Sequence, residues 1–105
     1  MILVTTDGIS GKELETLGLV RGSTIQTVNA VKDFGAGLKT LVGGELGSYT
    51  EMMDKARALA TKRMVEDAEK LDADAIVCIR YATSSVMANA AEVMAYGTAV
   101  KYKEA

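Results

Sequence analysis

The longest regular pattern of apolar residues in the chain runs from residue 49 to residue 71. Hydrophobic side chains recur there three or four positions apart with charged side chains between them, which predicts one long amphipathic helix. Ser48 and Glu51 have the spacing of a capping box at its start. The apolar positions are Tyr49, Met52, Met53, Ala56, Leu59, Ala60, Met64, Ala68 and Leu71. We interpret this stripe as a core-packing face rather than a methionine-rich binding surface.

Extended segments flank this helix. Residues 2–5 are predicted as a short strand, and the segment from Leu19 to about Lys32 as one long strand with a bend or bulge near Gly22. Two further strands are expected at residues 76–83 and 93–102, joined by a hairpin connection over residues 84–92.

A short second helix is expected between the long strand and the long helix. Asp33 can cap its start, apolar residues follow at helical spacing, and Gly43-Gly44 ends it. With 105 residues, the chain fits a single domain spanning 1–105. The predicted fold class is α+β: an antiparallel sheet with one long and one short helix.

The last two strands are apolar on both faces. Met94, Tyr96, Val100 and Tyr102 would lie on one face of the last strand, and Val93, Ala95 and Ala99 on the other. In the preceding strand, Ile76, Cys78 and Ala82 would oppose Val77, Ile79 and Tyr81. One long and one short helix cannot cover both sides of such a sheet. A second chain is the simplest cover, so a symmetric homo-oligomer is predicted.

Net charge and composition limit the classes of partner that the protein is expected to bind. Twelve basic and 14 acidic residues leave a net charge of -2, without the broad positive field that nucleic-acid binding needs. No apolar run approaches the roughly 20 residues of a membrane span, and the first residues lack a basic, signal-like start. We therefore expect a cytoplasmic protein with no nucleic-acid or membrane partner.

The chain has one cysteine and no histidine. Zinc sites with four Cys or His ligands and histidine-based nucleophilic triads are therefore excluded within one chain. Cys78 lies in an apolar strand, where a buried small hydrophobe is the favoured interpretation over a reactive thiol. No cofactor and no catalytic residue is predicted. The acids and bases Asp33, Lys39, Glu45, Glu51 and Arg57, together with several tyrosines, form no catalytic pattern.

The segment from Val31 to Tyr49 holds five of the ten glycines. Its backbone N–H groups at Gly43, Gly44 and Gly47, close to the start of the long helix, would suit an anion or phosphate, with Ser48 and Tyr49 as flanking donors. These five residues form the candidate ligand-binding site. The same glycines could instead serve helix termination and close subunit packing.

Five short motifs in order resemble the YbjQ-like family of small uncharacterised proteins. They occupy residues 33–38, 42–49, 55–57, 73–77 and 96–100: Asp-Phe-Gly-Ala-Gly-Leu, Val-Gly-Gly with Gly-Ser-Tyr, Lys-Ala-Arg, Ala-Asp-Ala-Ile-Val and Tyr-Gly-Thr-Ala-Val. The resemblance implies a dodecin-like α+β subunit that assembles as a homopentamer with a barrel-like or propeller-like body. Asp72 stands where the family commonly has glycine, which can alter the end of the helix.

The family is often labelled as heavy-metal binding. Soft metals prefer thiolate, thioether and imidazole ligands, and a single chain lacks such a set. A ring could still bring copies of Cys78, Asp7 or Glu45 together on its axis. The sequence thus favours a non-enzymatic, homo-oligomeric binding or scaffold module, with metal binding across subunits as the alternative.

Overall fold

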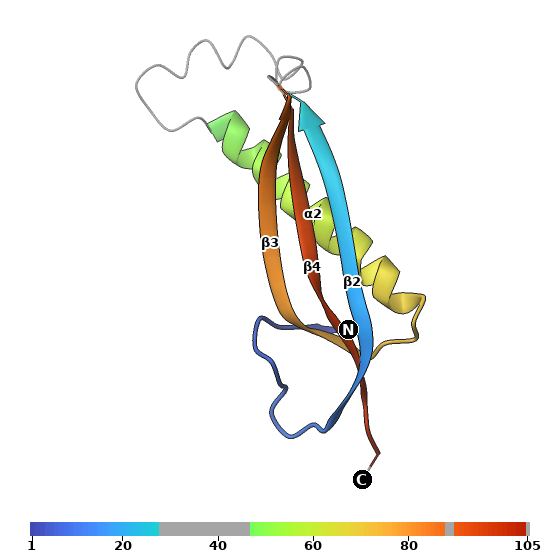
Figure 1. The fold of residues 1–105 in the computed structure, drawn as a ribbon. Coiled ribbons are helices and arrows are strands. Elements are labelled where there is room, and N and C mark those ends of the chain that lie inside the picture. The colour runs from blue at the N-terminus through green and yellow to red at the C-terminus, as the bar shows by residue number, and fades with distance from the viewer. Residues whose placement is uncertain (28–46, 88–89, 105) are drawn as a thin grey trace.

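The computed structural model describes residues 1–27, 47–87 and 90–104. Its elements are β1 (Ile2–Leu3), β2 (Leu14–Thr27), α2 (Gly47–Glu69), β3 (Ala75–Met87) and β4 (Ala90–Tyr102). The three long strands run alongside one another and α2 crosses behind them (Figure 1). At about 3.3 Å per residue, strands of 13 or 14 residues are about 45 Å long.

The sheet has the strand order β1-β3-β4-β2. The long strands pair antiparallel, as predicted, whereas β1 pairs parallel with the start of β3. The sheet is therefore mixed, and the prediction of a purely antiparallel sheet was wrong for β1. The α+β class and the long helix are confirmed. The short helix expected from Asp33 lies outside the described residues.

One face of the sheet packs against α2. The predicted stripe supplies this contact, because Ala56, Ala60, Met64 and Ala68 are fully buried. They meet Val20, Ile76, Ile79, Val93, Ala95 and Ala99 from the strands. Small side chains on α2 bring its backbone close to the sheet, and Gly22 of β2 lies directly under it. Leu71, predicted to extend the stripe, lies beyond the helix and is 44% exposed.

A bulge in β3 changes which residues share a face. The register with β4 shifts between Val77 and Arg80, and Cys78 has a φ of 56°. The extra residue places Ile76 and Ile79 in the same buried cluster, with Val77 and Cys78 packed on the opposite side. The predicted alternation along this strand was therefore wrong beyond Val77. The alternation predicted for Val93, Ala95 and Ala99 of β4 is confirmed.

Several strand boundaries also differ from the prediction. β2 begins at Leu14 rather than Leu19, and its register shift lies between Thr16 and Gly18, not near Gly22. The hairpin strands continue through residues predicted as a long connection, since β3 ends at Met87 and β4 begins at Ala90. Polar residues such as Ser84 and Ser85 extend β3 because they pair with Glu92 and Ala91.

The N-terminal segment covers the lower part of the second sheet face. Val4 and Ile9 pack there with Leu14 against a cluster built from Ala75, Val77 and Val100. Backbone hydrogen bonds tie this segment to β3: the N–H of Val4 donates to the carbonyl of Ile76 at 3.0 Å. No pattern along the N-terminal residues predicts this cover. It leaves the upper part of the face exposed.

The C-terminal end of α2 is capped by a residue whose backbone has the left-handed conformation. Asp72 has a φ of 58°, and the N–H of Ala73 donates to the carbonyl of Ala68 at 3.2 Å. This is the position at which glycine is favoured. The substitution noted in the sequence therefore keeps the helix end and adds backbone strain. In the parts of the chain that the structure describes, no helix is long and apolar enough to cross a membrane.

Candidate functional site

The glycine-rich candidate site falls at the edge of the described structure. Gly43 and Gly44 lie outside the described residues. Gly47, Ser48 and Tyr49 form the first turn of α2, but the structure does not describe their side chains. What is described is the start of a 23-residue helix whose first N–H groups have no partner within the helix itself. The capping box of Ser48 with Glu51 stays a prediction.

Among the described residues, the upper part of the sheet face opposite α2 is left open. We call it the open face. Residues of β2, β4 and β3 that pair directly across the strands form rows. The side chains of one row lie on the same face of the sheet. The rows contain Ile25, Glu92 and Ser84; Ser23, Met94 and Ala82; and Arg21, Tyr96 and Arg80. Leu19, paired with Thr98, continues the face toward the N-terminal segment.

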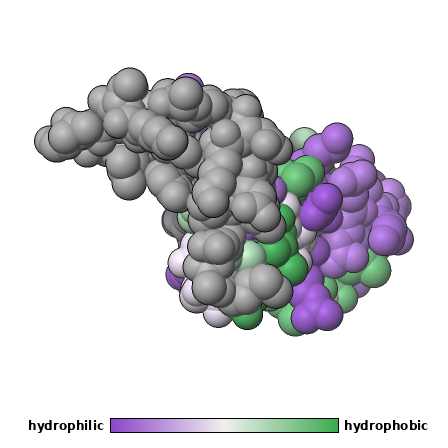
Figure 2. All heavy atoms as spheres, turned by 90° about the horizontal axis from the view of Figure 1, so that it is seen from above, coloured by the Kyte–Doolittle hydropathy of each residue, from purple (hydrophilic) through white to green (hydrophobic). Residues whose placement is uncertain are grey.

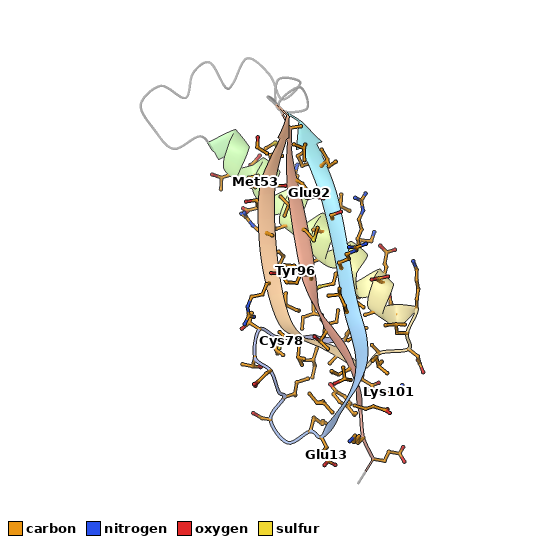
Figure 3. The ribbon with its side chains drawn as sticks, in the orientation of Figure 1. Glu13, Met53, Cys78, Glu92, Tyr96 and Lys101 are labelled. Carbon is orange, nitrogen blue, oxygen red and sulfur yellow. The ribbon has the colours of Figure 1, made fainter. Side chains whose placement is uncertain are left out.

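Large apolar side chains are exposed on the open face. Leu19 is 69% exposed, Ile25 58% and Tyr96 36%. Glu92 and Tyr96 follow one another down β4 in Figure 3, above Cys78 of β3. Seen from above, hydrophobic residues reach the surface beside a large hydrophilic area (Figure 2). Apolar exposure of this kind on a sheet marks a contact surface more often than an isolated exposed residue does.

Charged groups frame the same surface. The guanidinium of Arg80 is fixed by two backbone carbonyls, those of Thr5 at 3.0 Å and Ile79 at 2.9 Å. Arg21 lies two strands away in the same row, on the other side of Tyr96. Glu92 lies farther up β4 and accepts a hydrogen bond from the Ser84 hydroxyl at 3.4 Å. The open face is thus apolar at its middle and carries both signs of charge.

A second polar cluster lies below the end of α2. The Lys101 ammonium donates to the Asp72 carbonyl at 2.8 Å and lies 3.2 Å from its carboxylate. The Asp74 carboxylate accepts from the Tyr102 N–H at 2.8 Å. A shallow hollow of about 390 Å³ lies here, lined by Met1, Glu69, Asp72, Ala73 and Asp74. Asp72 and Asp74 are engaged by Lys101 and the Tyr102 N–H, so they connect the end of α2 to the sheet.

The proposed metal donors do not form a site within the described chain. No group of three or more histidine, cysteine, aspartate or glutamate residues there is placed to hold a metal ion. Cys78 is half-buried in the bulge of β3, Asp7 is exposed in the N-terminal segment, and Glu45 lies outside the described residues. Met64 is fully buried in the core. The donors that the structure describes in one subunit therefore do not fit a soft metal.

The acids and bases considered for catalysis are dispersed. Glu51 and Arg57 are on the exposed side of α2, where Arg57 pairs with Asp54 at 2.5 Å. Asp33 and Lys39 lie outside the described residues, as Glu45 does. In the parts that are described, none of these groups lies in the rows of the open face. Glu51 and Arg57 add charge to the exposed side of α2.

Sequence reasoning missed the row formed by Arg21, Tyr96 and Arg80. Arg21 and Arg80 lie in different strands 59 positions apart, and only the register of both with β4 brings them beside Tyr96. The two-faced pattern of the last two strands included Tyr96, whereas no pattern in the sequence pointed to the exposure of Leu19. The position of this exposed surface could not be predicted, because the N-terminal segment covers part of the same sheet face.

A family model described as "Putative heavy-metal-binding", YbjQ, matches residues 1–103. Curated relatives carry the name UPF0145 protein. One from Clostridium novyi is 67% identical over 101 residues, covering 96% of this chain and 98% of the relative. Another from Alkaliphilus metalliredigens is 64% identical over 102 residues, covering 97% and 99%. A third, from the archaeon Methanosarcina acetivorans, is 59% identical over 102 residues, covering 96% of each.

A solved structure has the same fold. It is the crystal structure of a protein of unknown function from Pediococcus pentosaceus, placed in the DUF74 family. The superposition has a TM-score of 0.70, covers 98% of both chains and pairs residues that are 17% identical. At this identity the similarity shows the fold alone.

Proposed function

The chain belongs to the YbjQ family of UPF0145 proteins, and we propose that it works as a homo-oligomeric, non-enzymatic binding or scaffold module. The observation that carries this proposal is the open face. Leu19, Ile25 and Tyr96 remain exposed on a sheet whose other face packs against α2. Covering them with other subunits would remove this apolar surface from water.

The size of the assembly follows from the family resemblance. A dodecin-like subunit in a homopentamer is the form that the resemblance implies, and a five-fold ring would give every subunit the same two neighbours. The elongated sheet suits such a ring, because each subunit has a long open surface available for contact. Light scattering coupled to size-exclusion chromatography tests the number. A monomeric mass at micromolar concentration would contradict the proposal.

We place the ligand site of this module at the start of α2. The N–H groups of Gly43, Gly44 and Gly47 would receive an anion near the positive end of the helix dipole, with Ser48 and Tyr49 as flanking donors. The support is the length of α2 and its start at Gly47. Inorganic phosphate is the probe. Thermal protection by phosphate, lost in Gly44→Ala with the assembly intact, would support the site. Loss of the assembly would show that Gly44 serves packing.

Metal binding across subunits is the second candidate, favoured by the description of the family model. One subunit does not supply a soft-metal ligand set in its described residues. Convergence of Cys78, Asp7 or Glu45 on a symmetry axis would be needed. Native mass spectrometry after exposure to zinc, copper or cadmium tests it. Stoichiometric uptake that disappears in Cys78→Ser would establish the candidate, and absence of uptake would rule it out.

A further inference from the structure

The row of Arg21, Tyr96 and Arg80 crosses the middle of the open face, and we call it the cationic row. Arg21 comes from β2, Arg80 from β3, and Tyr96 from β4 between them. Tyr96 lies midway along the sheet in Figure 3. Neighbouring strands are about 4.8 Å apart, so the Cα atoms of the two arginines are about 10 Å apart. The row therefore has a cationic side chain at each end and an aromatic ring in the middle.

Neither arginine of the cationic row has an acidic partner in the part of the chain that the structure describes. The ion pairs described there involve Arg57 on α2 and Lys101 near the lower end of β4, not Arg21 or Arg80. Glu92 belongs to the open face too, but it lies two rows higher on β4. The two positive charges of the row are therefore not compensated by any described side chain.

Hydrogen-bond donors of the cationic row remain available. Arg80 uses Nη1 for the carbonyls of Thr5 at 3.0 Å and Ile79 at 2.9 Å, which fix the guanidinium on the β3 side and leave Nε and Nη2 as donors. Within the described chain, the side chains of Arg21 and Tyr96 make no hydrogen bond. A guanidinium that is already fixed loses little entropy on binding. The row thus offers donors to a ligand that supplies acceptors.

The ring of Tyr96 gives the middle of the row an apolar surface. Its side chain is 36% exposed, so a ligand can reach it. Aromatic rings pack well against other flat apolar groups in an offset arrangement. Each end of the row has a single positive charge, which matches a carboxylate, whereas a phosphate group carries nearly two negative charges. Guanidinium and carboxylate groups also match in shape, because two N–H groups can donate to the two oxygens.

We propose that the cationic row binds a small aromatic dicarboxylate. One carboxylate pairs with Arg80, the other pairs with Arg21, and the flat middle of the ligand lies against Tyr96. This site goes beyond the proposed anion site at the start of α2 and uses other residues. It is compatible with the proposed homo-oligomer: Leu19 and Ile25 lie on either side of Arg21 along β2, so a copy that covers both encloses Arg21. The dicarboxylate then supplies the counter-charge that a buried arginine requires.

Equilibrium dialysis of the purified, assembled protein tests the site with terephthalate, a benzene ring with carboxylates at opposite ends. Benzoate has the same ring and one carboxylate, so it is the matched probe. We expect saturable binding of terephthalate, with benzoate bound at least about 10-fold more weakly, because one arginine loses its partner. Light scattering on the same samples records the mass, so a failure of the homo-oligomer is seen separately from a failure of the site.

Three substitutions of arginine by glutamine test the two ends of the row. Arg21→Gln removes one end, and its side chain makes no other contact that the structure describes. Arg80→Gln removes the other end. Arg57→Gln is the control, because Arg57 is an exposed arginine on α2, outside the row. We expect each row variant to lower the affinity for terephthalate at least about 10-fold, to the level of benzoate, and the control to leave it unchanged. Far-UV circular dichroism checks that all three keep the fold.

Three results would overturn the proposal. The first is the absence of terephthalate binding to the wild-type protein, as expected if carboxylates of a neighbouring copy occupy the row. The second is equal affinity for terephthalate and benzoate. The third is an unchanged affinity in Arg21→Gln, or a loss in Arg57→Gln as large as in Arg21→Gln. Gly44→Ala separates the two proposed sites: it should leave terephthalate binding intact, and a loss there would assign the ligand to the start of α2 and overturn the row.

Discussion

Gly22 of β2 lies directly against the backbone of α2 at Ala60. A Cβ atom added at residue 22 would collide with the Ala60 carbonyl oxygen and the Met64 nitrogen, and would come 2.6 Å from the carbonyl carbon of Arg63. Side chains can rotate away from such a contact, whereas helix backbone cannot. The distance between α2 and the sheet is therefore set by the absence of a side chain at this position.

Gly22→Ala is expected to destabilise the fold by about 3 kcal/mol, because α2 must move as a unit to admit the methyl group. Gly8→Ala is the control, since a Cβ there meets nothing within 4 Å. It should change the free energy of unfolding by less than about 0.5 kcal/mol. Urea denaturation followed by circular dichroism measures both. Equal stability of the two variants would show that α2 does not approach β2 this closely.

Asp72 at the end of α2 carries backbone strain that glycine would relieve. Asp72→Gly and Asp72→Ala both remove the carboxylate near Lys101, so a comparison of the two isolates the effect of the backbone. Because alanine resists the left-handed region, Asp72→Gly should be the more stable by about 1–2 kcal/mol. Thermal unfolding measures the difference. A more stable alanine variant would mean that residue 72 does not adopt a positive φ.

Helix α2 could be predicted from the sequence because the three- to four-residue spacing of its apolar side chains is visible within one stretch of chain. Ala56, Ala60 and Met64 lie on one face whatever they pack against. The faces of β3 could not be predicted, since one extra residue at Cys78 reverses the side chains from there to the next register shift after Ser85. Only pairing with β4 reveals it. The length of the hairpin was underestimated for a related reason: Ser84 and Ser85 become strand residues through their partners in β4.

Asp67 protects the outer edge of β2 as well as forming part of α2. Asp67→Ala should lower stability by about 1–2 kcal/mol, because the Arg21 N–H loses a hydrogen bond to a charged acceptor. Asp54→Ala removes only an exposed ion pair with Arg57 and should cost less than about 0.5 kcal/mol. Amide exchange reports on the same bond: the Arg21 N–H should exchange faster in Asp67→Ala alone. Unchanged exchange there would contradict the contact.

Ile25→Glu tests the open face as a subunit contact. The side chain of Ile25 is 58% exposed in the single chain, so the fold should tolerate the change, while a buried carboxylate would disrupt association. Leu71→Glu is the control, since Leu71 is 44% exposed but lies beyond the end of α2 and outside the rows of the open face. Analytical ultracentrifugation should show loss of the assembly only in Ile25→Glu. Dissociation of both variants to the same extent would point to a non-specific effect of the added charge.

The functional prediction from sequence was limited by what single residues reveal. The two-faced pattern of β4 led to an expected oligomer, and the exposed Leu19 and Tyr96 are consistent with it. The glycine-rich candidate site depends on residues 43, 44 and 47–49, most of whose geometry lies outside the described chain. Arg21 and Arg80 escaped notice because their shared row depends on strand register, which no local pattern encodes.

The mass of the purified protein in solution tests the central claim most directly. Sedimentation equilibrium at micromolar concentration should give one stable species at a whole-number multiple of the 11.1 kDa chain, with five copies as the expected multiple. Another stable multiple would correct the number of copies and keep the oligomeric module. A single species of 11.1 kDa across that range would contradict the account.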